Sequence, residues 1–126
     1  MKGVIISVCI AAIIVTGSIV YTKHMGKVSE ELGNINDEIM DKLEEENYES
    51  AMAKIKELSD YLDKNRTVLA ATGNHEEFDK IEMNISEMLG YTEGGQQTDA
   101  VSCCKVLSFL FKHIPKNYEM KLENIL

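Results

Sequence analysis

Residues 3–22 form an unbroken run of twenty uncharged and mostly apolar residues. At a helical rise of about 1.5 Å per residue this run is about 30 Å long, which matches the hydrocarbon thickness of a bilayer. Tyr21 and Lys23 at one end, and Lys2 at the other, are residue types that favour the lipid headgroups. We therefore predict that residues 1–22 are a transmembrane signal-anchor that binds the lipid bilayer through residues 3–22.

Three other kinds of N-terminal segment share this pattern. A cleaved signal peptide has a shorter apolar region followed by a small-x-small cleavage site, and residues 18–20, Ser-Ile-Val, match such a site poorly. A lipoprotein would need a small residue before its modified cysteine, but Val8 precedes Cys9, and a pilin would have glutamate where Val8 stands. The signal-anchor is therefore the preferred interpretation, with cleavage as its main alternative.

The orientation of this span depends on the basic residues that flank it. The N-terminus and Lys2 on one side nearly balance Lys23 and Lys27 on the other. A very short tail ahead of a signal-anchor usually stays in the cytoplasm, although the adjacent free cysteines at 103 and 104 fit a reducing compartment better. We expect a single-pass protein of the cell membrane whose residues 23–126 are extracytoplasmic.

The rest of the chain, residues 23–126, is acidic, with 12 basic against 21 acidic side chains and hence a formal net charge of -9. This charge argues against nucleic acid as a partner. Cys9, Cys103 and Cys104 make no disulfide framework, and no spacing of cysteine and histidine predicts a metal site. The carboxylates of residues 41–49 lack the loop pattern that organises a calcium site. We predict no cofactor and no metal.

Apolar residues recur at helical spacing in four successive segments. The first helix ends near residues 44–47, and Asn47 caps a second helix that continues to Thr72, where Gly73 turns the chain. The apolar positions of these two helices are Val28, Leu32, Ile35, Ile39 and Leu43, then Tyr48, Ala51, Ile55, Leu58 and Leu62. With only Gly26 and Gly33 as weak points, the first helix is able to continue from the membrane span as one rod.

A capping box of Asn74 and Glu77 starts a third helix that ends near Gly90 and has Phe78, Ile81, Ile85 and Met88 on its apolar side. After a loop over residues 91–97, Thr98 or Asp99 caps a fourth helix, which Pro115 is expected to end at Ile114. The inner face of this helix has Ala100, Cys103, Cys104, Leu107, Leu110, Phe111 and Ile114.

These segments predict an all-α fold, because no alternating pattern of useful length indicates a strand. We expect an N-terminal transmembrane helix followed by a short-looped antiparallel bundle of about four helices over residues 23–126. The tail, residues 116–126, is expected to lie across the bundle through Tyr118, Leu122, Ile125 and Leu126.

Two short motifs resemble a known family. Residues 75–82, His-Glu-Glu-Phe-Asp-Lys-Ile-Glu, and the ending His113-Ile114-Pro115 with residues 122–126, Leu-Glu-Asn-Ile-Leu, are similar to the Domain of Unknown Function 4363 family. The resemblance covers essentially the whole chain and implies a small, membrane-anchored helical protein of a Gram-positive bacterium, with a partner in the membrane. Family members often have tryptophan ahead of the histidine motif, whereas this chain has Arg-Thr-Val-Leu-Ala-Ala at residues 66–71.

His75, Asp79 and Glu82 lie along one edge of the predicted third helix at i, i+4 and i+7. This spacing suits a histidine oriented by a carboxylate or a divalent cation, although a local pair between His75 and Asp79 at the start of the helix is the simpler and preferred explanation. His113 is expected to interact with carbonyl groups near the end of the fourth helix. No serine, threonine or cysteine can be tied to His75 as a nucleophile, so we predict no catalytic residues and no enzyme.

Val106 and Phe109 lie on the fourth helix away from its apolar inner face. A helix with apolar residues on both faces is either central in its bundle or covered by a partner. We therefore expect a non-enzymatic, membrane-tethered interaction protein or accessory subunit of a membrane complex, whose partner is a membrane protein or a second copy. The alternative is an extracytoplasmic sensor that binds a cation or small ligand near His75, Asp79 and Glu82.

Overall fold

The computed structural model of the protein describes the backbone of residues 1–70 and 75–125 and the side chains of residues 1–70 and 75–114. These residues form helices and turns and contain no strand, which confirms the predicted all-α fold. The helices are α1 (Lys2–Glu44), α2 (Tyr48–Lys64), α3 (Arg66–Ala70), α4 (His75–Glu93) and α5 (Gln97–Ile125).

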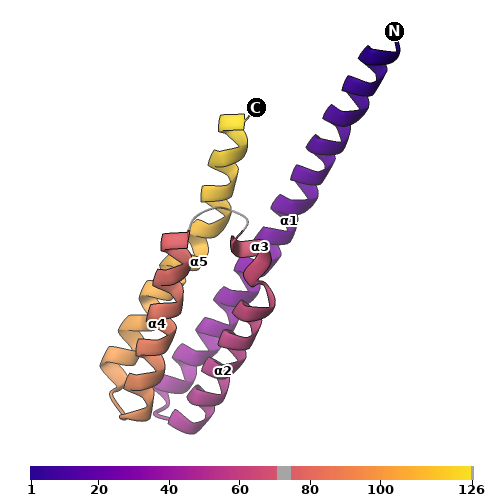
Figure 1. Cartoon of the computed structure of the whole chain (residues 1–126). Coiled ribbons are helices and arrows are strands. Elements are labelled where there is room, and N and C mark those ends of the chain that lie inside the picture. Colours follow the sequence, from indigo (N-terminus) through magenta and orange to yellow (C-terminus); the bar gives the residue numbers. More distant parts are fainter. Residues whose placement is uncertain (71–74, 126) are drawn as a thin grey trace.

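The longest element is α1, which has 43 residues and is about 64 Å long at 1.5 Å per residue. It joins the apolar stretch to the first amphipathic segment without a break, as the sequence allowed (Figure 1). The first residue of α1 that is buried is Met25, only three positions after Thr22, and burial continues at helical spacing to Leu43. A single continuous helix therefore contains both the exposed apolar segment and one of the four helices of the bundle.

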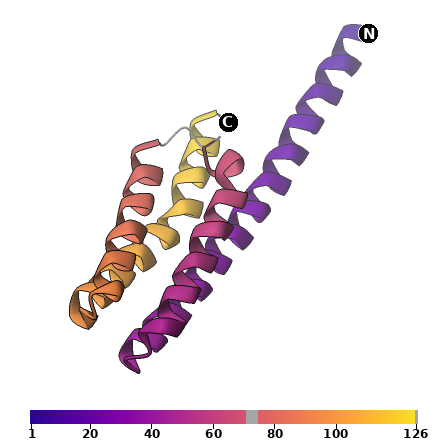
Figure 2. The same ribbon diagram turned by 60° about the horizontal axis from the view of Figure 1, so that its bottom comes forward.

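The helices α1, α2, α4 and α5 form an antiparallel bundle (Figures 1 and 2). Around the bundle, α1 packs against α2 and α5, and α4 packs against α5 and, less extensively, α2. The two short turns lie together at what we call the far end of the bundle, and α3 lies at the near end, beside the exposed half of α1.

The core consists of the apolar stripes that the sequence predicts, together with Met25 and Leu69. Its fully buried large side chains include Leu32 and Leu43 of α1, Leu58 of α2, Met88 of α4 and Phe111 of α5. Burial of side chains of this size is worth about 1.5–3 kcal/mol each. Packing of the apolar stripes is therefore the main favourable contribution that holds the four helices together.

The two turns at the far end have the same backbone geometry. After α1, the amides of Asn47 and Glu46 donate to the carbonyls of Lys42 and Leu43, at 2.9 and 3.0 Å, and Glu46 has a φ of 58°. This is the hydrogen-bond pattern of a Schellman motif, in which the left-handed residue is usually glycine. The turn after α4 repeats the pattern, with bonds from Gln96 to Tyr91 and from Gly95 to Thr92, and there the left-handed residue is Gly95, with a φ of 68°.

The predicted loop over residues 91–97 was too long, since only residues 94–96 lie between α4 and α5, and the predicted cap at Thr98 or Asp99 was wrong. Helix α4 continues to Glu93, and the hydroxyl of the buried Thr92 donates to the Met88 carbonyl at 2.7 Å. Helix α5 starts at Gln97, whose side-chain amide donates to the Leu43 carbonyl at 2.8 Å. That contact satisfies an open carbonyl at the end of α1.

The second predicted helix was too long, because the chain breaks at Asn65 between α2 and α3. The Asn65 side chain donates to the Tyr61 carbonyl at 2.9 Å, and its backbone amide is shared between Tyr61 and Leu62. Asparagine competes in this way with regular helical hydrogen bonds. The predicted end at Thr72, the turn at Gly73 and the cap at Asn74 lie outside the described residues.

Pro115 does not end the last helix, contrary to the prediction, because α5 continues to Ile125. Proline has no amide hydrogen, so the Phe111 carbonyl loses the donor that a helix would supply four residues later. The buried hydroxyl of Ser29 in α1 donates to this carbonyl instead. The tail also extends along the axis of α5 rather than lying across the bundle (Figure 1). The side chains of Tyr118, Leu122, Ile125 and Leu126 lie outside the described residues.

Candidate functional site

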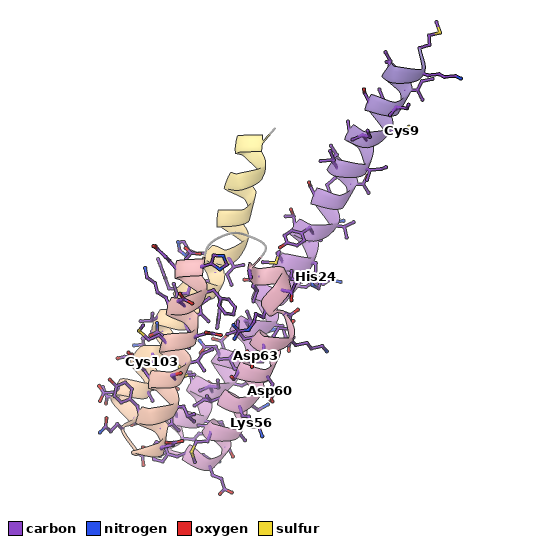
Figure 3. All side chains as sticks on the ribbon, viewed as in Figure 1. Cys9, His24, Lys56, Asp60, Asp63 and Cys103 are labelled. Atoms are coloured by element: carbon purple, nitrogen blue, oxygen red, sulfur yellow. The ribbon has the colours of Figure 1, made fainter. Side chains whose placement is uncertain are left out.

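The N-terminal half of α1 exposes its apolar side chains, as Figure 3 shows for the segment around Cys9. Val4 is 68% exposed and Ile13 is 71% exposed. Among the described residues, α1 is the one helix that is long and apolar enough to cross a membrane, and none of its most apolar window is buried. This half of α1 therefore lies outside the core of the chain, and in water it would be an apolar surface far larger than folded domains normally expose.

The junction between the apolar half of α1 and the bundle is held by a contact that the sequence did not indicate. The hydroxyl of Tyr21 donates to the Val68 carbonyl in α3. Leu69 is buried next to it, and Met25 is fully buried one turn further along α1. The near end of the bundle is thus fixed to α1 within a few residues of the apolar stretch.

The three residues of the candidate ligand site lie on α4 but differ in their surroundings. His75 and Asp79 are exposed at the start of the helix, whereas Glu82 is partly buried and its carboxylate pairs with the Arg66 guanidinium of α3. Arg66 also pairs with Asp63 at 3.1 Å and lies 5.0 Å from the centre of the Phe78 ring. The bonds to Asp63 and Glu82 raise the pKa of Arg66.

This arrangement makes Glu82 part of a clamp between α3 and α4. Among the described residues no group of three histidine, cysteine or acidic side chains is arranged to hold a metal ion. The structure thus places His75, Asp79 and Glu82 on one helix, as the spacing predicts. The Glu82 carboxylate, however, is paired with the Arg66 guanidinium of another helix.

The second candidate site is the outer face of α5. Phe109 is 61% exposed and Val106 is 46% exposed, while Leu107 and Phe111 on the inner face are buried. The Phe109 ring stacks on the His113 ring with centres 4.1 Å apart, and the His113 Nδ1 lies 2.9 Å from the Phe109 carbonyl oxygen. The expected contact of His113 with a helix carbonyl is therefore present, and it holds an aromatic pair on the surface of α5.

The adjacent cysteines are free and buried, as the sequence predicts for ordinary core thiols. The Cys104 sulfur lies 3.3 Å from the Met88 sulfur in α4. Burial raises the pKa of Cys104 to about 12 and also raises the pKa of Cys103. Burial therefore disfavours the reactive thiolate form of both side chains at neutral pH.

The sequence did not predict that two polar residues of α1 are buried. Ser29 bonds to the Phe111 carbonyl, and the Asn36 amide donates to the Cys104 carbonyl at 2.8 Å. The Asn36 Oδ1 atom is buried without a hydrogen-bond partner. Both polar residues lie beside the apolar stripe of α1, four positions after Met25 and Leu32, and this placement was the available signal. A buried asparagine of this kind typically fixes the register of paired helices.

Two shallow grooves run between helices. The groove between α1 and α5 has a volume of about 240 Å³ and is lined by Ser29, Glu30, Gly33, Asn34, Asp37, Ser108, Phe111 and Lys112. The groove between α2 and α4 has a volume of about 260 Å³ and includes Asp63, Arg66 and Glu82. Neither groove is lined by a histidine or a cysteine.

The fold and these surfaces define an all-α protein whose four-helix bundle is continuous with a long, exposed apolar helix. Within that class the chain belongs to the family described as domain of unknown function (DUF4363), whose model matches residues 19–125. The match confirms the resemblance seen in residues 75–82 and 113–115, and it covers the bundle together with the end of the apolar stretch. No curated protein and no solved structure matches the chain.

Proposed function

We propose that this protein is a non-enzymatic accessory subunit of a membrane complex, anchored by residues 3–22 and presenting its bundle outside the cytoplasm. The observation that carries the proposal is the combination of the exposed apolar half of α1 with exposed Val106 and Phe109 on α5. The apolar helix suits a bilayer, and the face of α5 has the aromatic and aliphatic character of a protein contact.

The position of this face supports a partner that lies beside the bundle. Phe109 and Val106 lie on the side of α5 opposite the buried residues Leu107 and Phe111. The stacked His113 restricts the Phe109 ring, and a rigid aromatic residue loses little entropy on binding. A single membrane protein, or a second copy of this chain, is the partner that we propose for this face.

Photo-crosslinking in intact membranes tests this proposal. A crosslinking amino acid at position 109 should capture one defined membrane protein or a second copy, and the same residue at Lys56, exposed on α2, should not (Figure 3). If position 109 recovers the same mixture of abundant membrane proteins as position 56, α5 is not a partner surface. A cysteine-reactive probe that cannot cross membranes, applied to a cysteine at position 56, tests the orientation.

The alternative function, an extracytoplasmic sensor of a cation or small ligand at His75, Asp79 and Glu82, has less support because Arg66 already pairs with Glu82. Its test is the thermal unfolding of wild type and His75→Ala across divalent metals and pH. A metal-dependent stabilisation that His75→Ala removes would favour the sensor over the accessory subunit.

A further inference from the structure

The register between α1 and α5 is constant along the bundle. Within the described residues, hydrogen bonds between the two helices pair Ser29 with Phe111, Asn36 with Cys104 and Leu43 with Gln97, whose amide also reaches the neighbouring Glu44 carbonyl at 3.4 Å. From each pair to the next, the position advances by seven residues along α1 and goes back by seven residues along α5. Two antiparallel helices with the same rise per residue keep this correspondence as far as both continue.

Helix α5 continues well beyond Phe111, the paired residue nearest to its end. Residues 115–125 add about 16 Å to the helix after Ile114. By the same register, this extension lies at the level of α1 residues 15–25. Figures 1 and 2 both show the end of α5 beyond α3, on the side of the N-terminal half of α1. The apolar stretch ends at Thr22, so the end of α5 overlaps the level of its last two turns.

No spacer separates the bundle from the apolar stretch. Met25 is already in the core, and Tyr21 bonds to α3. A bilayer that holds residues 3–22 therefore meets the near end of the bundle directly. The extension of α5 lies at the level of α1 residues 15–25, so it reaches the bilayer when residues 3–22 span the hydrocarbon. It could remain in bulk water only if part of the apolar stretch left the hydrocarbon.

The composition of the extension suits a lipid surface. Residues 115–126 contain two lysines and two glutamates, so the segment is neutral, and the net charge of -9 lies entirely in residues 23–114. Tyr118, Met120, Leu122, Ile125 and Leu126 supply apolar and aromatic residue types found in interfacial helices. At the far end, by contrast, the turn after α1 has Glu44, Glu45 and Glu46 in succession.

We propose that residues 115–125 are a second membrane contact, a helix lying in the headgroup and upper acyl region of the leaflet through which α1 leaves the bilayer. This inference rests on the proposed anchoring of residues 3–22. The ligand is the lipid surface itself, and the contact fixes the rotation of the bundle about α1 in addition to its height.

The chain contains no tryptophan, so single substitutions give clean fluorescent reporters. Full-length Tyr118→Trp, Tyr48→Trp and Ile10→Trp would each be placed in phosphatidylcholine vesicles with a nitroxide on the lipid at a shallow or a deep position. Tyr48 marks the far end of the bundle, and Ile10 marks the middle of the apolar stretch. Circular dichroism checks that each variant keeps its helices, and Leu122→Trp repeats the measurement within the extension.

Tryptophan at 118 and 122 should emit at shorter wavelength than at 48 and be quenched most by the shallow label, while tryptophan at 10 is quenched most by the deep label. If positions 118 and 122 behave like 48 while position 10 is quenched, the second contact is wrong and the anchor stands. If position 10 is not quenched, the anchor itself fails. Emission at 118 that follows the protein-to-lipid ratio would assign the segment to a second copy and overturn the proposal.

Discussion

Replacing Ser29 by alanine tests how the bundle accommodates a proline inside its last helix. The Phe111 carbonyl has no helical donor because residue 115 is proline, and the Ser29 hydroxyl takes the place of that donor. Ser29 is 8% exposed and lines the groove between α1 and α5, so water would have to enter that groove to replace the hydroxyl. Ser29→Ala should therefore leave a buried carbonyl without its donor.

The expected loss follows from the cost of a buried, unpaired polar group. Such a group costs about 1–3 kcal/mol, so Ser29→Ala should lower the free energy of unfolding by that amount. In a Pro115→Ala background the amide of residue 115 becomes available to the Phe111 carbonyl. The same Ser29→Ala change should then cost less than about 1 kcal/mol, which leaves a coupling free energy between the two sites within the usual range of about 0.5–3 kcal/mol.

The measurement is a double-mutant cycle on the full-length chain in detergent micelles, with urea unfolding followed by circular dichroism. Pro115→Ala alone should stabilise the protein by up to about 3 kcal/mol, because proline is costly inside a helix. Ser102→Ala, at an exposed position of α5, is the matched control and should have little effect. An equal loss from Ser29→Ala with and without Pro115 would refute the role of Ser29 as the substitute donor.

Three further predictions concern the far end and the core. Glu46→Gly should raise the free energy of unfolding by about 1 kcal/mol, since Glu46 is left-handed where the equivalent turn has Gly95, and an unchanged or lower urea midpoint would contradict this. Asn47→Ala should cost about 0.5–2 kcal/mol, because the Asn47 side chain accepts from the Ser50 amide at 3.3 Å, whereas Asn47→Asp should keep most of the stability in the same assay. Burial raises the pKa of Cys104 from 9.0 to about 12, so the unfolded chain loses this proton first and stability should fall between pH 9 and 12. The stability of Cys104→Ala should fall less over that pH range. An identical dependence of stability on pH for both proteins would show that Cys104 does not contribute.

The sequence predicted the helices well, because each presents one continuous apolar stripe. Leu32 and Leu43 of α1, and Leu58 of α2, are in the core as their spacing indicated. Spacing within one helix depends only on local geometry, so a single sequence contains it. The position of His75 on α4 could be predicted for the same reason.

The break at Asn65 comes from a local bond to Tyr61, but other errors lie where a long-range contact affects the local structure. The start of α5 depends on the bond from Gln97 to Leu43, and its continuation through Pro115 depends on Ser29, which is 82 positions from Phe111 in the chain. The role of Glu82 depends on Arg66, which belongs to another helix. Turn and proline rules describe isolated segments, and none of them specifies which side chain a neighbouring helix will supply.

The geometry also limits where a partner of α5 can sit. By the register between the helices, Phe109 lies at the level of α1 residue 31, nine residues beyond Thr22 and therefore about 14 Å from the end of the apolar stretch. Because α1 is one unbroken helix, this height cannot change without unfolding the near end of the bundle. If residues 3–22 span the bilayer, a partner that binds Phe109 must present a surface at that height. A domain close to the membrane meets this requirement, and a loop buried within the bilayer does not.

Inserting four residues after Lys23 would break the Tyr21 contact and shift the surface around Phe109 by about 6 Å relative to the apolar stretch. Crosslinking from position 109 should then be lost even though the face itself is unchanged.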